Sequence, residues 1–175
     1  MKIKLTFLFL LFIGSNLFAQ KDWNTFEQDN YAISYPRDWQ SSNQKPEPSI
    51  EVLLLSDEKS QKEDQFRESI NLKLENLRGQ EMRLETYTKI SLNQIRAQMP
   101  GAEVISNDPI KINNLEARAV IWSAESNNGT VLKFKRTFLI HNGRAYIITF
   151  SSTEAEYDEY IEVADKIINT FNLAK

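Results

Sequence analysis

Residues 115–173 read LEARAVIWSAESNNGTVLKFKRTFLIHNGRAYIITFSSTEAEYDEYIEVADKIINTFNL, and the rest of the chain can be placed around them. The dipeptides Asn128-Gly129 and Asn142-Gly143 each separate two apolar runs, which is the strongest short-range signal for a β-hairpin. Asn and Gly tolerate the positive φ angles that such turns need. The stretch therefore predicts three antiparallel strands and then a helix, which we expect to begin with a capping box at Thr153-x-x-Glu156.

The length of each turn decides which residues face each other across these strands. With two-residue turns, the second hairpin pairs Phe138 with Ile147, and the first pairs Ile121 with Arg136 and Ala119 with Phe138. A three-residue loop at 127–129 would instead shift the first strand by one residue and turn its side chains to the other face.

Two-residue turns give a sheet with apolar side chains on both faces. One face then carries Ala117, Ala119, Ile121, Phe134, Phe138, Ile140, Ala145 and Ile147, and the other carries Val120, Trp122, Leu139, Tyr146, Ile148 and Phe150. We expect both faces to be covered, at least in part. Arg136 would lie among apolar neighbours, so it must either reach an edge or meet an acidic partner.

The first twenty residues differ in kind from the rest. Lys2 and Lys4 precede the apolar run Leu5–Ile13, and a stretch with small residues leads to Ala19. This pattern is typical of a secretory signal peptide and is too short for a comfortable membrane span. We expect cleavage after Ala19 or Gln20, which divides the chain into a signal peptide at 1–19 and a single domain at 20–175. An uncleaved anchor and a buried core helix are the alternatives.

The composition limits the cellular environments and the kinds of partner that can be expected for this protein. The 175-residue chain has no Cys, one His and a formal charge of −3, and cleavage would remove two lysines and no acid. This acidic balance gives no reason to expect nucleic-acid binding, and no later segment is apolar for long enough to cross a bilayer. The absence of Cys excludes a disulfide and a lipid on an N-terminal Cys. We therefore expect an exported protein, periplasmic or extracellular, whose partner is an unknown envelope protein and whose oligomeric state is not indicated.

The remaining mature chain predicts further strands and one more helix. Residues 41–49 and 57–68 are polar and predict loops, the second of them mobile. The expected strands are Trp23–Phe26, Tyr31–Tyr35, Ile50–Leu55, Ser69–Leu77, Ala102–Ser106 and Ile110–Ile112, and the expected helix is Leu84–Met99. Asp108-Pro109 is expected to turn the chain between the last two strands. The sequence thus predicts an α+β fold, an antiparallel sheet of about six strands sandwiched by helices.

Two segments resemble a known family. The pattern Tyr31-x-Ile33-x-Tyr35-Pro36-x-x-Trp39 and the run Ala145–Ser152, followed by a helix ending in Ile167–Phe171, resemble the PsbP-like (Mog1/PsbP, DcrB-like) superfamily. The resemblance implies an antiparallel sheet of six or so strands between helices and non-enzymatic work. PsbP proteins attach to photosystem II, Mog1 binds a small GTPase, and DcrB-like members are envelope proteins. The resemblance assigns a functional role to no residue of this chain.

Catalytic and metal-binding patterns are weak. His141 has no Cys and no second His as companion, so a surface histidine is favoured over a metal ligand or a catalytic base. The acidic pairs Glu154/Glu156 and Asp158/Glu159 favour a solvated helix face over calcium binding or acid–base chemistry. Asn128-Gly129-Thr130 matches a glycosylation sequon, but the turn needs Asn-Gly for backbone reasons. We predict no enzyme, no cofactor and no metal.

Candidate interaction residues are aromatic and cationic. Tyr35, Trp39 and Trp122 are the candidates for an interaction surface, although Tyr35 and Trp39 also fit a packed core. The set Arg118, Lys133 and Lys135 could bind an anion, or could cover an apolar sheet face with its stems. The leading function is a protein-interaction module that uses the loops 41–49 and 57–68. The alternative is a carrier that holds a small apolar ligand between helix and sheet, in a cavity lined by Trp122, Tyr146 and Phe150.

Overall fold

The computed structural model describes residues 23–61 and 65–174, so the predicted signal peptide and its cleavage site at Ala19 and Gln20 lie outside the described residues. Its strands are β1 (Trp23–Gln28), β2 (Tyr31–Pro36), β3 (Gln40–Ser42), β4 (Ile50–Leu55), β5 (Ser69–Asn76), β6 (Glu103–Ile112), β7 (Leu115–Glu125), β8 (Val131–His141), β9 (Arg144–Thr153) and β10 (Asn172–Leu173). The helices are α2 (Leu84–Gln98) and α3 (Tyr157–Asn169).

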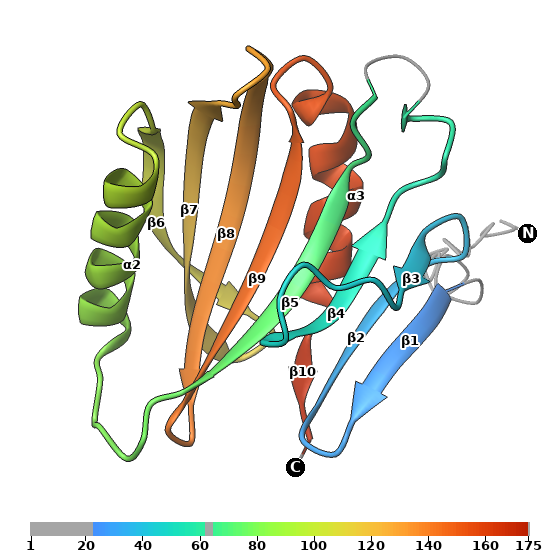
Figure 1. The fold of residues 1–175 in the computed structure, drawn as a ribbon. Coiled ribbons are helices and arrows are strands. Elements are labelled where there is room, and N and C mark those ends of the chain that lie inside the picture. Colours follow the sequence, from blue (N-terminus) through green and yellow to red (C-terminus); the bar gives the residue numbers. More distant parts are fainter. Residues whose placement is uncertain (1–22, 62–64, 175) are drawn as a thin grey trace, which may run out of the picture.

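The strands form a large antiparallel sheet between two helical layers. Its order is β3-β4-β5-β9-β8-β7-β6, and a small sheet of order β1-β2-β10 lies beside it (Figure 1). Helix α2 covers one face of the large sheet, while α3 and β2 cover the other. The predicted α+β class, with helices on both faces, is confirmed; the large sheet has seven strands because the three-residue β3 adds an edge.

The register between β8 and β9 is confirmed and the register between β7 and β8 is wrong. Asn142 and Gly143 both have positive φ, 47° and 70°, and the two-residue turn pairs Phe138 with Ile147. In the first hairpin only Gly129 has positive φ, at 86°, and the N–H of Ser126 donates to the carbonyl of Thr130 at 2.8 Å. This is the three-residue loop, a turn followed by a left-handed glycine.

The longer loop turns β7 over relative to the expectation. Ile121 pairs with Lys135, and Val120 with Arg136. Val120, Trp122 and Ala124 therefore share the α2 face with Phe134, Phe138, Ile140, Ala145 and Ile147. Ala117 and Ile121 lie instead on the α3 face with Leu139, Tyr146, Ile148 and Phe150. Both faces are buried, as the apolar character of both sides requires.

The edge strand β6 is continuous where the sequence predicted a turn. Asp108 pairs with Ala119 and Pro109 with Arg118 inside the ladder, so Asp108-Pro109 does not reverse the chain. Proline is tolerated here because an edge strand has only one neighbour, so half of its N–H groups make no ladder bond.

Helix α3 begins later than predicted and without the capping box. Thr153 is the last residue of β9, and Glu156 occupies the N-cap position with no side-chain capping bond. Tyr157, Ala164 and Ile168 recur at helical spacing along one side of α3, and all three are buried. At the other end, the N–H of Ser34 donates to the Thr170 hydroxyl at 2.8 Å and ties the helix to β2.

The polar segment 57–68 is anchored at its end. Glu68 is fully buried, its carboxylate accepts bonds of 3.4 Å from the hydroxyls of Ser56 and Ser152, and its carbonyl accepts the N–H of Ser56 at 2.9 Å. Arg67 donates from Nε to the carbonyl of Ser56 at 2.7 Å. The prediction of a mobile surface loop is therefore wrong for Arg67 and Glu68, because buried polar groups must find partners.

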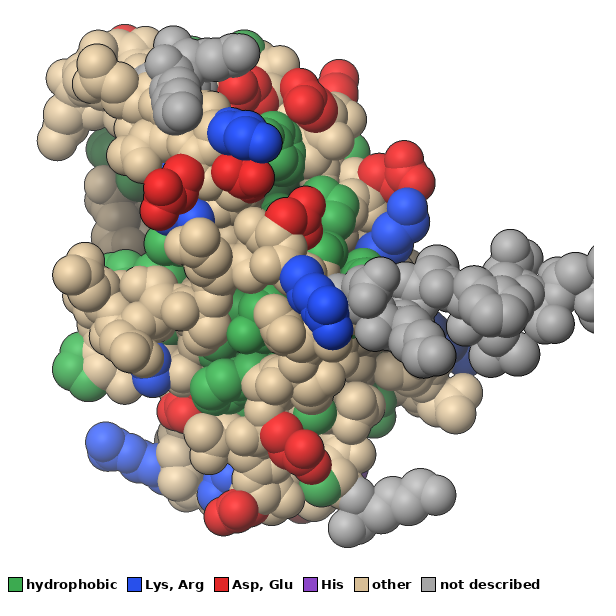
Figure 2. Space-filling model, turned by 90° about the vertical axis from the view of Figure 1, so that its right-hand side faces the viewer, with side chains coloured by type: hydrophobic (Ala, Val, Ile, Leu, Met, Phe, Trp, Pro, Cys, Tyr) green, Lys and Arg blue, Asp and Glu red, His purple; other side chains and the backbone are tan. Residues whose placement is uncertain are grey.

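The surface on the side of β1 and β3 has mixed character. Acidic, basic and hydrophobic side chains are interspersed there, with Asp and Glu more frequent in the upper part of the view (Figure 2). The described part of this side therefore shows no broad surface of one charge.

Replacing Phe138 by Ala tests the packing of the α2 face. Phe138 is 1% exposed and packs edge-on against Tyr87 with ring centroids 5.8 Å apart. We expect the free energy of unfolding to fall by about 3–5 kcal/mol, as for other buried aromatics. Val131→Ala, at an exposed position of the same strand, should change it by about 0.5 kcal/mol or less. Equal losses in the two variants, measured by urea titration, would contradict the burial of Phe138.

Candidate functional site

A polar cleft of about 410 Å³ lies between α2, the sheet and the loop before β4. Strand β5 contributes to it because its residues alternate: Ile70 and Leu72 point to the α3 core, so Asn71, Lys73 and Glu75 point to the α2 side. The other polar lining residues are Glu47, Tyr87, Ser91, Gln94, Gln98, Arg136 and Thr149. A polar hollow thus lies within the layer that α2 covers.

Arg136 enters this cleft from the middle of β8. Its neighbours Thr137 and Phe138 are buried, on opposite faces of the strand, and the alternation leaves Arg136 on the α2 side with Phe138. The Nε–H donates to the hydroxyl of Thr149, its cross-strand partner, at 3.1 Å. Its guanidinium carbon lies 5.9 Å from the centre of the Trp122 ring, within the range of a cation–π contact.

The guanidinium has no carboxylate partner in the part of the chain that the structure describes. Among residues 23–61 and 65–174, no Asp or Glu oxygen lies within 4.0 Å of an Arg136 nitrogen. Burial lowers its pKa from the ordinary arginine value, although arginine stays protonated at any physiological pH. Neither outcome expected from the sequence is therefore met: Arg136 does not pair with an acid, and it lies within the sheet, not at its edge.

The nearby acidic groups are engaged elsewhere. Lys73 Nζ lies 3.3 Å from Glu47 Oε2 and 3.4 Å from Glu75 Oε1. Tyr87 donates its hydroxyl proton to Glu75 Oε2 at 2.6 Å, and burial, followed by this bond, raises the pKa of Tyr87 above its usual range. Since Lys73 and Tyr87 take up the carboxylates, the N–H groups of Arg136 other than Nε–H have no acidic acceptor within the described chain.

The predicted aromatic interaction residues are buried. Tyr35 is 8% exposed, Trp39 3% and Trp122 3%, and Trp122 stacks on Phe134 with centroids 4.0 Å apart. Tyr35 and Trp39 belong to the α3 core, whereas Trp122 belongs to the α2 core. None of the three offers an exposed contact surface, because each completes the packing of its layer. Trp122 is linked to the cleft only indirectly, because the guanidinium of Arg136 lies over its ring.

The predicted cationic set does not form a cluster. Arg118 lies on the α2 side and donates from Nε to Asn107 Oδ1 at 2.9 Å. Lys133 and Lys135 lie on the α3 side, where Lys133 sits 4.2 Å from the centre of the Tyr157 ring and Lys135 pairs with Asp165. The flipped strand β7 separates Arg118 from the two lysines, so the alternative of one anion site built from all three does not hold.

No metal-binding group is found among the described residues. Three or more His, Cys, Asp or Glu side chains do not come together there in a metal-binding arrangement. His141 lies beside the β8–β9 turn, and Glu154, Asp158 and Glu159 are exposed.

Within residues 23–61 and 65–174, no helix has the length and hydropathy to cross a membrane.

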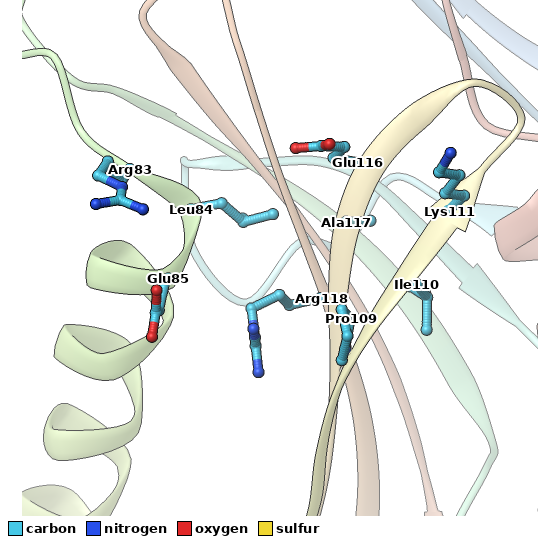
Figure 3. Close-up of a pocket in the computed structure, with 9 residues that line it drawn as sticks. All are labelled: Arg83, Leu84, Glu85, Pro109, Ile110, Lys111, Glu116, Ala117 and Arg118. Carbon is cyan, nitrogen blue, oxygen red and sulfur yellow. The ribbon is translucent and has the colours of Figure 1, made fainter.

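A second hollow is an open groove at the sheet edge. It measures about 670 Å³ and lies between the start of α2 and the strands β6 and β7 (Figure 3). Leu84 and the apolar residues of β6 and β7 contribute to it, and charged side chains surround them: Arg83, Glu85, Lys111, Glu116 and Arg118. Trp122, Tyr146 and Phe150 do not line one cavity as predicted for a carrier, because Trp122 lies on the opposite face of the sheet from the other two, and all three are buried.

A family model described as PsbP-like protein matches residues 16–173. The chain belongs to the PsbP-like family. The predicted PsbP-like/Mog1 superfamily is thus confirmed. A comparison with curated protein sequences finds no match for this PsbP-like chain at a significant level.

Solved structures share the fold at low sequence identity. CyanoP, the cyanobacterial PsbP from Synechocystis, superimposes with a TM-score of 0.63 at 12% identity and covers 87% of this chain and 93% of its own. LpqN of Mycobacterium tuberculosis, described as involved in cell envelope biogenesis, has a TM-score of 0.62 at 10% identity, covering 87% and 91%. The Ran-binding protein Mog1p of Saccharomyces cerevisiae has a TM-score of 0.60 at 9% identity, covering 86% and 95%. These likenesses show the fold.

The sequence alone does not indicate the cleft, because the residues that line it come from distant segments of the chain. Glu47, Lys73, Tyr87 and Arg136 belong to a loop, two strands and a helix. The one local signal was an arginine at an inward position of a strand, since buried charges are rare without a partner.

Replacing Arg136 by Met tests whether its charge supports the fold. Removing a partly buried cation that has no acidic partner relieves its desolvation, which offsets the lost bond to Thr149, so we expect the free energy of unfolding to stay within about 1 kcal/mol of the native value or to rise. Lys135→Met, which removes a paired cation of the same strand, should lower it by up to about 1 kcal/mol. A loss of about 3 kcal/mol or more for Arg136→Met would mean that the cation has an acidic partner in the folded protein.

Proposed function

We propose that this PsbP-like chain is an exported, non-catalytic binding protein of the cell envelope, which holds a polar segment of a protein partner in the cleft beside α2. The observation that carries the proposal is the cleft itself, where a partly buried guanidinium lacks a carboxylate partner among the described residues. A charge kept without a partner lowers stability, so a binding role is a physical reason for its presence.

The side-chain chemistry supports a non-catalytic role. The buried hydroxyls of Ser56 and Ser60 bond to each other at 2.8 Å, and Ser56 also reaches Glu68, in a site closed to solvent. His141, the one histidine, lies on β8 beside the turn to β9, far along the strand from Arg136. Nucleophile, base and oxyanion donors are thus not assembled in one cleft of the described chain.

Export to the envelope is supported by two independent features. Residues 2–19 have the basic start, apolar run and small-residue end of a secretory leader. LpqN, whose fold this chain shares, is described as involved in cell envelope biogenesis.

The alternative, a carrier for a small apolar ligand, has less support. An apolar carrier encloses most of its ligand in a largely apolar pocket. The groove at the sheet edge is open, and charged side chains line it beside the apolar ones. A polar binding cleft therefore fits the geometry better.

Export is tested by the mass of the native protein. We expect the intact mass of protein isolated from the envelope fraction to correspond to a chain beginning at Gln20 or Lys21, since a signal peptidase removes the leader. A full-length chain recovered from the cytosolic fraction would contradict export.

Partner capture tests the role of the loop before β4. Pro46 lines the cleft, so the replacement Pro46→Gly, which loosens this loop, should weaken capture of a partner from native envelope extract. Glu58→Gly, at an exposed position of the other polar loop, is the matched control and should capture the partner as the native protein does. Loss of capture only in the control would place the contact on the segment 57–68 and not on the cleft.

A further inference from the structure

We infer that the cleft recognises a carboxylate carried by an acidic residue of the partner polypeptide, and that Arg136 is the residue that binds it. This inference rests on the proposed function, since it names the chemistry of the segment that the binding protein would hold. It follows from the geometry of the guanidinium, from the charges around it, and from the amide side chains that line the same cleft.

The guanidinium of Arg136 is held in place before any ligand arrives. Its Nε–H is bonded to Thr149, and its carbon lies over Trp122, which is itself stacked on Phe134. Two fixed contacts on one planar group leave its outer N–H groups with a set direction. Such preorganisation reduces the ordering cost of binding, and the planar fork of arginine matches the two oxygens of a carboxylate.

The charges around Arg136 favour a ligand with a single negative charge. Lys73 lies between Glu47 and Glu75, so this trio retains one net negative charge beside the cleft. A dianion such as phosphate would meet repulsion from both glutamates. A carboxylate carries half that charge and still satisfies the arginine fork, so it is the better match.

The remaining lining residues suit a peptide. Asn71, Gln94 and Gln98 line the cleft, and their amides make no hydrogen bonds within the part of the chain that the structure describes. Each amide offers both donors and an acceptor, the same pair of functions that a peptide group presents. A volume of about 410 Å³ is suited to one or two residues of an inserted segment. The cleft therefore combines one charge anchor with groups that can bond to a main chain.

The test is a titration of the purified protein with a capped tripeptide, acetyl-Gly-Glu-Gly-amide, followed by nuclear magnetic resonance. We expect saturable shifts at the Arg136 Nε–H and at the side-chain amides of Asn71 and Gln94. The glutamine analogue acetyl-Gly-Gln-Gly-amide should bind at least about tenfold more weakly, because it lacks the charge-assisted hydrogen bonds. Inorganic phosphate and acetate are titrated in parallel to separate the peptide from its bare charge.

Three variants make the result specific. Arg136→Gln should abolish the shifts, and Arg136→Lys should restore only part of the affinity, because lysine keeps the charge and loses the fork. Lys133→Gln, on the opposite face of the same strand, should bind as the native protein does. A native-like melting temperature for each variant confirms that the fold persists.

The inference is overturned if the glutamate peptide gives no saturable shift, if Arg136→Gln binds it as well as the native protein, or if phosphate or acetate binds at least as tightly. The proposed function has a separate readout. A partner captured equally by native protein and by Arg136→Gln would retain the binding role while removing Arg136 from it, whereas failure of both to capture any partner would contradict the binding role itself.

Discussion

The register of β7 on β8 is the constraint on which the site depends. A loop of three residues at 127–129, closed by the Ser126–Thr130 bond and the left-handed Gly129, places Trp122 opposite Phe134. Both rings then lie on the α2 face, and the guanidinium of Arg136 lies over the indole. With a loop shorter by one residue, Trp122 would lie on the α3 face. Arg136 would then lie beside Ala119 and Ile121 and would lose its cation–π contact with the indole.

The same layer combines a filled core with a retained charge. Phe138 and Ile147 are buried next to the cleft. Arg136 lies on β8, between β9 and β7, and its bond to Thr149 uses only the Nε–H of the guanidinium. The nearby carboxylates do not relieve it, because Lys73 and Tyr87 hold them. Folding stability would be served as well by an apolar side chain at this position, and this is why we assign the charge to binding.

The sequence was sufficient where one local rule acted alone. Asn142-Gly143 specified a two-residue turn, and the alternation of β5 and the apolar stripe of α3 placed their side chains correctly. It was insufficient where two local solutions were close in energy: Asn128-Gly129 suits a two-residue or a three-residue loop, and Thr153 could have capped α3 but continues β9. The cleft was beyond reach for another reason, since Glu47, Tyr87 and Arg136 are brought together only by the packing of α2 on the sheet.

The shared fold of CyanoP, LpqN and Mog1p leaves the chemistry of each protein to its own side chains. In this chain, Arg136 is the side chain that we propose to be open to a carboxylate from outside. A crystal structure of the protein grown with acetyl-Gly-Glu-Gly-amide tests it most directly. We expect the glutamate carboxylate to lie on the outer nitrogens of Arg136, with N–O distances of about 2.7–2.9 Å. A guanidinium paired instead with Glu47 or Glu75 of its own chain, with the peptide bound elsewhere or absent, would contradict it.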